Sequence, residues 1–151
     1  MLCACIDMLR KTLATIAILA SVLVASAVLA QAPPRTVDID DSQSGGKLMV
    51  FQGDTVEVRL HSTPGTGYSW KVLHVDSAVL SQKKASVFVP PPQDIPGAEG
   101  HLVFDFLASA PGRSTLQLAY TRPWEKDVAP ARTFNVEVTV RPASDRPLPQ
   151  P

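Results

Sequence analysis

Apolar and polar residues alternate along most of this chain after its first 30 residues. In residues 56–61 and 134–140, apolar side chains fill every second position, and charged or polar side chains lie between them. A period of two is typical of a β-strand that has one buried and one solvated face. Turn-forming residues separate further segments of this kind. The expected strands are residues 36–39, 47–51, 56–61, 70–74, 85–89, 102–106, 115–120 and 134–140.

Seven or eight short strands with no helical period predict an all-β fold, an immunoglobulin-like antiparallel β-sandwich over residues 36–141. The Cys…Trp…Cys pattern of antibody domains is absent. About 110 residues suffice for one such core and are too few for two domains. Residues 31–35 are expected to be a linker. Residues 142–151 hold four prolines and are expected to be a disordered tail.

The first 30 residues resemble an export signal. A basic pair at positions 10–11 precedes the apolar run 13–29, and Ala30 supplies the small residue that a signal peptidase requires. We therefore expect a signal peptide over residues 1–30 and a periplasmic or secreted product. Asp7 is unusual in such a segment, which leaves Met8 open as the start. An uncleaved membrane anchor is the alternative, because the run is at the lower edge of the ~17–25 residues that span a bilayer.

Cleavage at that point changes the charge and the cysteine content. The 14 basic and 14 acidic residues become 12 and 13, so the mature surface is nearly balanced. Such a balance argues against nucleic acid or an anionic membrane as the main partner. Both cysteines, Cys3 and Cys5, lie in the leader. The mature domain must therefore be held together by its core without disulfides, which is compatible with periplasm and with secretion. We expect a monomer.

The chemistry-bearing residues do not indicate an enzyme. The three histidines, His61, His74 and His101, share no metal-ligand spacing, and the mature chain has no cysteine nucleophile. Ser69 lacks the Gly-x-Ser-x-Gly context of a nucleophile elbow. His61 and His101 are expected at strand ends in contact with solvent. We therefore expect no catalytic residue, metal or cofactor.

Three segments interrupt the predicted strands in an unusual way: residues 63–69, 97–100 and 122–130. Loops at alternate connections of such a sandwich emerge at the same end. We therefore expect these segments to form one continuous surface at one pole of the domain. Loops that a rigid scaffold holds in place commonly carry function.

The first segment has a shaped backbone. Pro64 fixes one φ angle, and Gly65 and Gly67 permit positive φ, so that Thr66 is presented between them. Taken alone, this segment is also explained as an ordinary turn.

The third segment places Trp124, a large apolar ring, beside a proline where a loop begins. Taken alone, this ring is explained as a residue folded back over the sandwich end. Arg122 would then stack on it or pair with Asp127.

Together, the three segments resemble those of the chagasin-like inhibitors of papain-family cysteine proteases. That family carries an Asn-Pro-Thr-Thr-Gly-Tyr-type loop, a Gly-x-Gly-Gly-type loop and an Arg-Pro-Trp loop on an immunoglobulin-like sandwich. The resemblance covers about residues 36–141. The matching residues are Pro64, Thr66, Gly67, Tyr68 and Trp70 in the first motif, Gly97 and Gly100 in the second, and Arg122, Pro123 and Trp124 in the third.

Three departures from the family pattern bear on binding strength. Gly65 replaces a threonine and makes the first loop more costly to order. Glu99 places a carboxylate at the rim, where a glycine is usual. Thr63 replaces the asparagine that could brace the loop, although its hydroxyl can partly substitute.

The resemblance implies a reversible, competitive inhibitor whose partner is a papain-like cysteine protease. It implies that the first loop covers the catalytic cysteine and histidine of the protease, with Thr66 near the centre. The second loop would flank the first through its backbone. The third loop would lie on the primed side, where Trp124 would pack on an aromatic residue of the protease. The residues that would bind the protease are Thr63, Pro64, Gly65, Thr66, Gly67, Tyr68, Gly97, Ala98, Glu99, Gly100, Arg122, Pro123 and Trp124.

The fold alone leaves one alternative open. An immunoglobulin-like sandwich hosts many functions, so a binding or structural module of the cell envelope without inhibitory activity would have the same strand pattern.

Overall fold

The computed structural model describes residues 32–92 and 99–147. The predicted signal peptide, Gly97 and Ala98 in the second segment, and the last four residues of the predicted tail lie outside the described residues. Within the described ranges, no helix is long and apolar enough to cross a membrane. Residues 31–151 form a compact unit of their own.

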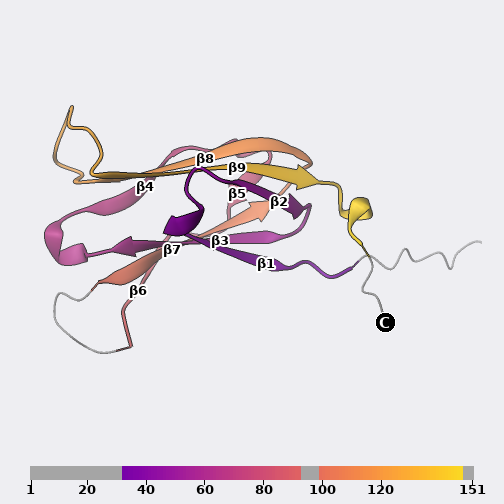
Figure 1. The fold of residues 1–151 in the computed structure, drawn as a ribbon, viewed down its shortest axis with the longest axis horizontal. Helices are drawn as coiled ribbons and strands as arrows, with labels where there is room; N and C mark the ends of the chain where they lie inside the picture. Colours follow the sequence, from indigo (N-terminus) through magenta and orange to yellow (C-terminus); the bar gives the residue numbers. More distant parts are fainter. Residues whose placement is uncertain (1–31, 93–98, 148–151) are drawn as a thin grey trace, which may run out of the picture. The chain divides into compact units, whose positions relative to one another are not determined.

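The described chain forms two β-sheets that face each other as a sandwich (Figure 1). Sheet A has the strand order β1-β3-β7-β5, with β6 also paired to β7, and sheet B has the order β2-β9-β8-β4. Three short 3₁₀ turns, η1 (Asp41–Gln43), η2 (Pro64–Thr66) and η3 (Ala143–Asp145), complete the elements. The strands are β1 (Thr36–Asp40), β2 (Lys47–Phe51), β3 (Thr55–Ser62), β4 (Ser69–His74), β5 (Leu80–Gln82), β6 (Val87–Val89), β7 (Gly100–Ala108), β8 (Gly112–Thr121) and β9 (Arg132–Arg141).

The all-β sandwich expected from the sequence is confirmed, but its sheets are mixed rather than fully antiparallel. β1 pairs in parallel with β3, and β2 pairs in parallel with β9. The chain passes from β1 in sheet A to β2 in sheet B and back to β3. Because no hairpin joins either parallel pair, no tight turn forces an antiparallel arrangement on them.

The edge of sheet A contains a strand that the alternation did not predict. Gln82 of β5 pairs with Phe106, and Val87 of β6 pairs with Val103, so residues 83–86 face only two residues of β7. β5 and β6 are therefore two parts of one edge strand that a bulge interrupts. The described residues thus form nine strands, and the connections that carry the three segments still emerge at the same end.

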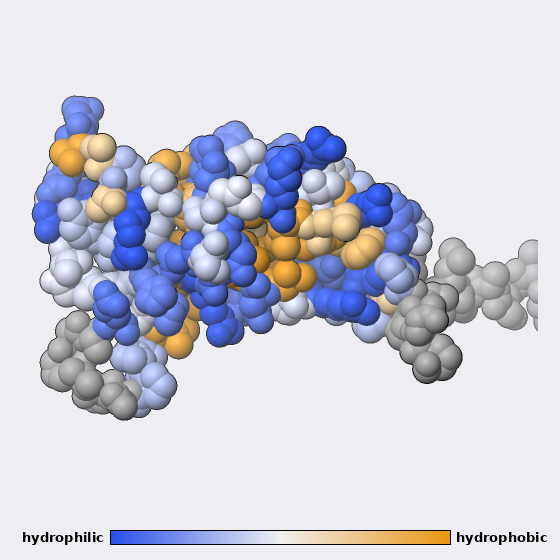
Figure 2. Space-filling view, in the orientation of Figure 1, coloured by the Kyte–Doolittle hydropathy of each residue, from blue (hydrophilic) through white to orange (hydrophobic). Residues whose placement is uncertain are grey.

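The core follows the alternation that the sequence displays. Most apolar positions of the central strands point between the sheets and are buried, and most polar positions are in contact with solvent, with Ser62, Asp105 and Ser114 as buried exceptions. Complete burial of one such side chain stabilises the fold by about 1.5–3 kcal/mol. In Figure 2, apolar side chains lie along the middle of the view between hydrophilic ones. The large buried apolar residues of the longer strands are Val56, Val58, Leu60, Phe104, Phe106, Leu116, Leu118, Tyr120, Phe134, Val136, Val138 and Val140.

The C-terminal segment differs from the disordered tail that its prolines predicted. Arg146 is only 7% exposed and forms a buried salt bridge with Asp54. Its guanidinium also donates to the carbonyl of Pro33 at 2.7 Å. Asp54 accepts two more hydrogen bonds, from the backbone N–H groups of Arg35 at 2.8 Å and Phe51 at 2.9 Å. Pro33 and Arg35 of the expected linker and Arg146 of the expected tail are thus bound to one another and to the sandwich through Asp54.

Candidate functional site

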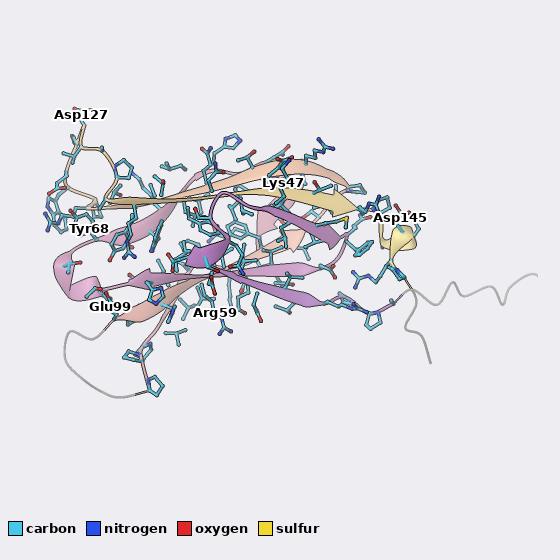
Figure 3. The ribbon with its side chains drawn as sticks, viewed as in Figure 1. Lys47, Arg59, Tyr68, Glu99, Asp127 and Asp145 are labelled. Atoms are coloured by element: carbon cyan, nitrogen blue, oxygen red, sulfur yellow. The ribbon has the colours of Figure 1, made fainter. Side chains whose placement is uncertain are left out.

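The strand register brings the three interrupting segments to one end of the sandwich. Ser62 at the end of β3 pairs with Gly100 at the start of β7, and Ser69 of β4 pairs with Thr121 of β8. We name the connections loop 1 (residues 63–68), loop 2 (residues 90–99) and loop 3 (residues 122–131), and their shared end the loop pole. Figure 3 shows Tyr68, Glu99 and Asp127 together at this end of the sandwich, with Lys47 and Asp145 away from it.

Loop 1 is a single 3₁₀ turn. The N–H of Thr66 donates to the carbonyl of Thr63 at 3.1 Å, and the N–H of Gly67 donates to the carbonyl of Pro64 at 3.0 Å. Proline suits the first position of such a turn, and a glycine in the left-handed region suits its end. Gly67 has a φ of 76° and meets that requirement. Pro64, Gly65 and Thr66 are exposed at the tip.

The structure adds two details to loop 1. Gly65 does not adopt positive φ, and a β-carbon built on it would meet no described atom within 4 Å. The brace of the loop comes from Thr66 rather than from Thr63, since the Thr66 hydroxyl donates to the Thr63 carbonyl at 2.7 Å. The Thr63 side chain makes no capping hydrogen bond to the turn.

Trp124 of loop 3 lies on the backbone of loop 1. A β-carbon at Gly67 would come 2.2 Å from Cη2 of Trp124 and 2.8 Å from Cζ2. Only glycine therefore permits this approach. Trp124 is nevertheless 65% exposed and forms no part of the core. Loop 3 thus presents a large apolar surface that rests against loop 1.

Arg122 links loop 3 to loop 1. Its Nε donates to the carbonyl of Thr66 at 3.3 Å, and its guanidinium lies 4.4 Å from the centre of the Tyr68 ring. Its Nη1 pairs with Glu125 at 3.0 Å. The suggested stacking on Trp124 and pairing with Asp127 are replaced by these contacts.

Glu99 of loop 2 and Gly100, the first residue of β7, lie in the described part of the loop pole. Glu99 is exposed at the rim, whereas Gly100 is buried. A β-carbon at Gly100 would come 2.5 Å from Cζ of Phe88 and 2.6 Å from the carbonyl oxygen of Val89. Gly100 is therefore required by close packing against β6.

Two residues that the sequence did not assign to the protease-binding set lie directly beneath loop 1. The Tyr120 hydroxyl accepts a hydrogen bond from the Thr63 N–H at 3.0 Å, and the Trp70 indole N–H donates to the carbonyl of His61 at 2.9 Å. Alternation had marked Tyr120 as a core position only. Its polar end gave no separate signal, because the residue that it contacts is distant in sequence.

The histidines His61 and His101 lie near the ends of β3 and β7, as expected, with His61 exposed and His101 half-buried, and they are neighbours. They face each other across β3 and β7, with ring centres 4.5 Å apart. Nδ1 of His61 lies 2.7 Å from a carboxylate oxygen of Asp41. No group of three histidine, cysteine or acidic residues in the described ranges could hold a metal ion.

These features define a class of protein: a β-sandwich with three loops that emerge at one pole. The model of the chagasin family of peptidase inhibitors, I42, matches residues 50–138, which is more than half of the chain and includes all three loops, and the protein belongs to this family. This membership confirms the resemblance noted in the sequence and the expectation that the protein is not an enzyme.

Individual relatives agree with this assignment. The chain is 27% identical over 104 residues to amoebiasin-2 of Entamoeba histolytica, covering 68% of this chain and 84% of that protein. It is 28% identical over 104 residues to chagasin of Trypanosoma cruzi, covering 65% of this chain and 92% of chagasin. The fold is similar to the crystal structure of the cysteine protease inhibitor EhICP2 from Entamoeba histolytica, with a TM-score of 0.63, 21% identity, and coverage of 71% of this chain and 96% of that one.

Proposed function

We propose that this protein is a reversible, competitive inhibitor of papain-like cysteine proteases, and that the loop pole enters the active-site cleft. The observation that carries the proposal is the exposed Trp124 ring resting on Gly67, beside a turn that matches the family motif. Membership of an inhibitor family supplies the activity class. The target class is carried over from the related EhICP2, a cysteine protease inhibitor.

Loop 1 would act as a wedge that a protease cannot cleave readily. Its tip is exposed, and Gly65 has no side chain to keep the backbone away from the catalytic cysteine. The hydrogen bonds of the 3₁₀ turn and the Thr66 hydroxyl hold the backbone compact. Since a peptide must be extended to present its scissile bond, cleavage would require those bonds to break. Occupancy of the cleft would exclude substrate, which makes the inhibition competitive.

Trp124 would anchor the complex on one side of the wedge. Buried tryptophans commonly dominate interface energies, with losses of about 2 kcal/mol or more on truncation. The ring already rests on loop 1, so it needs little rearrangement before it packs on an aromatic residue of the protease. Loop 2 would flank the wedge on its other side, with the Glu99 carboxylate at the rim.

The proposed site of action rests on the N-terminal sequence. The apolar run over residues 13–29 and the small residue Ala30 after it favour export to the periplasm or the medium, and the absence of cysteine after the run is compatible with both. We infer that the mature domain acts there as a monomer, on a protease of the same cell or of another organism.

A titration of residues 31–151, which form their own compact unit, tests the proposal. The domain is added to papain and to a cathepsin L-like enzyme with a fluorogenic peptide substrate. Competitive inhibition in the nanomolar range, about −12 kcal/mol of binding free energy, is expected. Met49→Ala is the matched control, because Met49 is an exposed apolar residue on β2 and away from the loop pole. Absence of inhibition at micromolar concentration by a folded domain would overturn the proposal and favour the envelope-module alternative.

A further inference from the structure

Sheet B ends beneath loop 1 in a row of three paired residues, which we name the end row: Trp70, Tyr120 and Arg132. Trp70 of β4 pairs with Tyr120 of β8, which in turn pairs with Arg132 of β9. Directly paired residues project from the same face of a sheet. The Arg132 guanidinium accordingly lies 4.7 Å from the centre of the Tyr120 ring and 5.8 Å from that of Trp70. The Trp70 and Tyr120 rings are 5.1 Å apart.

Side chains of the end row form hydrogen bonds with the chain that leads from β3 of sheet A into loop 1. We name this segment, residues 61–63, the stem of loop 1. The His61 carbonyl at the end of β3 accepts from the Trp70 indole N–H at 2.9 Å and from Nη2 of Arg132 at 3.4 Å. Two residues further along, the Thr63 N–H donates to the Tyr120 hydroxyl at 3.0 Å. Side chains of sheet B therefore bind the stem of loop 1 at two points, the His61 carbonyl and the Thr63 N–H, one on each side of Ser62.

The tip of loop 1 has little stiffness of its own. It consists of one short turn, and Gly65 at its centre lies against no described side chain. A flexible loop loses conformational entropy when it enters a cleft, and that loss weakens binding. The stem must then supply the order that the tip lacks.

We propose that Arg132 is a positioning residue for loop 1, which acts through Tyr120 and the His61 carbonyl to hold the wedge in its inserting conformation. This inference rests on the proposed inhibitory function. Arg132 lies outside the three motifs that the family resemblance identified, so it adds a residue to the candidate site. In the described part of the chain, the contacts of its guanidinium are with the end row and with the stem of loop 1.

The electrostatics of Tyr120 agree with this arrangement. Burial alone would raise the pKa of the phenol, but hydrogen bonds with Thr63, Thr66 and Ser62, together with the nearby charge of Arg132, outweigh it and lower the pKa from 10.0. The surroundings thus favour negative charge on the hydroxyl oxygen, and such an oxygen is a better acceptor for the Thr63 N–H.

The test compares Arg132→Met with Tyr120→Phe and with Arg113→Met as the control. Methionine keeps an unbranched apolar side chain but removes the charge and the N–H donors, and phenylalanine removes only the hydroxyl. Arg113 is an exposed arginine of the same sheet, near the opposite end of β8. The measurements are the inhibition constant against papain, hydrogen exchange of the Thr63 amide, the thermal midpoint, and the alkaline titration of the two tyrosines that the chain contains.

We expect Arg132→Met and Tyr120→Phe each to raise the inhibition constant by about three- to tenfold and to speed Thr63 exchange by a similar factor. The double variant should lose less than the product of the two single effects, since both residues act on one stem. Arg132→Met should also raise the pKa of Tyr120 toward 10.0. The thermal midpoint of each single variant should stay within about 3 °C of the control.

Inhibition and Thr63 exchange equal to those of Arg113→Met would overturn the proposal. So would a loss of inhibition that only parallels a fall in thermal midpoint, since Arg132 would then be a general stability residue. If Tyr120→Phe does not fold, Arg132→Met decides the matter alone. If the wild-type domain inhibits no protease, the proposed function fails, but unchanged or accelerated Thr63 exchange still decides whether Arg132 holds the stem.

Discussion

Trp124 lies so close to Gly67 that a β-carbon at Gly67 would come 2.2 Å from the ring atom Cη2. The contact joins loop 3 to loop 1, which are distant in sequence and belong to different connections of the sandwich. The contact determines where the Trp124 ring lies relative to the tip of loop 1. The geometry of the candidate interface therefore depends on a residue that contributes no side chain.

Gly67→Ala should impair inhibition more than Gly65→Ala. At Gly67 the φ of 76° disfavours any other residue, and a methyl group would displace the Trp124 ring. We expect the inhibition constant of Gly67→Ala to rise about tenfold or more. At Gly65 the backbone is compatible with alanine and the space is open, so stability should increase by about 0.4–1 kcal/mol. Equal inhibition by the two variants in a papain assay would contradict the role assigned to the Gly67–Trp124 contact.

Trp124→Ala should separate binding from stability. Trp124 is 65% exposed, so the loss of its side chain removes little buried surface from the free domain. We expect inhibition to weaken at least about tenfold, which corresponds to about 1.4 kcal/mol, with a nearly unchanged thermal midpoint. Val128→Ala is the control, because Val128 is also an exposed apolar residue of loop 3. A matching fall in the thermal midpoint would instead identify Trp124 as a stabilising residue.

Alternation predicted most of the sandwich because it records which face of each strand is buried. It missed β5, since three residues are too few to display a period and β5 pairs only at the interrupted edge. It also missed the parallel pairs, because strand direction depends on which sheet the chain enters next. The residue types in residues 142–151 predicted disorder, although a single arginine within them meets a buried aspartate 92 residues earlier.

The candidate site was predictable where a residue type imposes its own conformation. Glycine and proline marked loop 1, and an apolar ring beside a proline marked loop 3. A glycine's type shows that positive φ is permitted, but only the structure shows that Gly67 uses it and Gly65 does not. Tyr120 and Arg132 escaped prediction, because their role arises from cross-strand register and from contact between two sheets.

Asp54→Asn should destabilise the domain without changing its inhibitory surface. The substitution would leave Arg146 buried without its counter-charge, and breaking a buried ion pair typically costs about 3–5 kcal/mol. Asp54 precedes β3, at the end of that strand opposite to loop 1. We therefore expect a lower urea midpoint but an unchanged inhibition constant per folded molecule. Asp145→Asn, at an exposed carboxylate nearby in sequence to Arg146, is the control. If Asp54→Asn lost little stability, the Asp54–Arg146 salt bridge would not be what holds residues 142–147 on the sandwich.

The Asp54 carboxylate should make the free energy of unfolding depend on pH in the acidic range. Burial alone would raise the pKa of Asp54, but hydrogen bonds from Arg35, Phe51 and Arg146 outweigh it and lower the pKa below 3.8. A group with a lowered folded-state pKa stabilises fully above its unfolded pKa, about 3.9, and loses that contribution as pH falls through the folded value. Urea unfolding between about pH 2 and pH 6 should show the wild type and Asp54→Asn converging below about pH 4. A constant difference across that range would rule out ionised Asp54 as the source.

Glu99→Gln should reveal how the rim charge affects target choice. Glu99 is exposed at the edge of the loop pole, where the family usually has glycine, and its carboxylate would approach the protease surface. Charges at an interface rim act mainly on the association rate and are screened by salt. Against a protease with an acidic cleft, we expect faster association by about two- to fivefold at low salt, and a smaller gain at 0.5 M salt. Glu137→Gln on β9, which lies away from the loop pole, should leave the rate unchanged. Equal rates for both variants would mean that Glu99 stays outside the field of the protease, and selectivity would then depend on loop 1 and Trp124 rather than on rim charge.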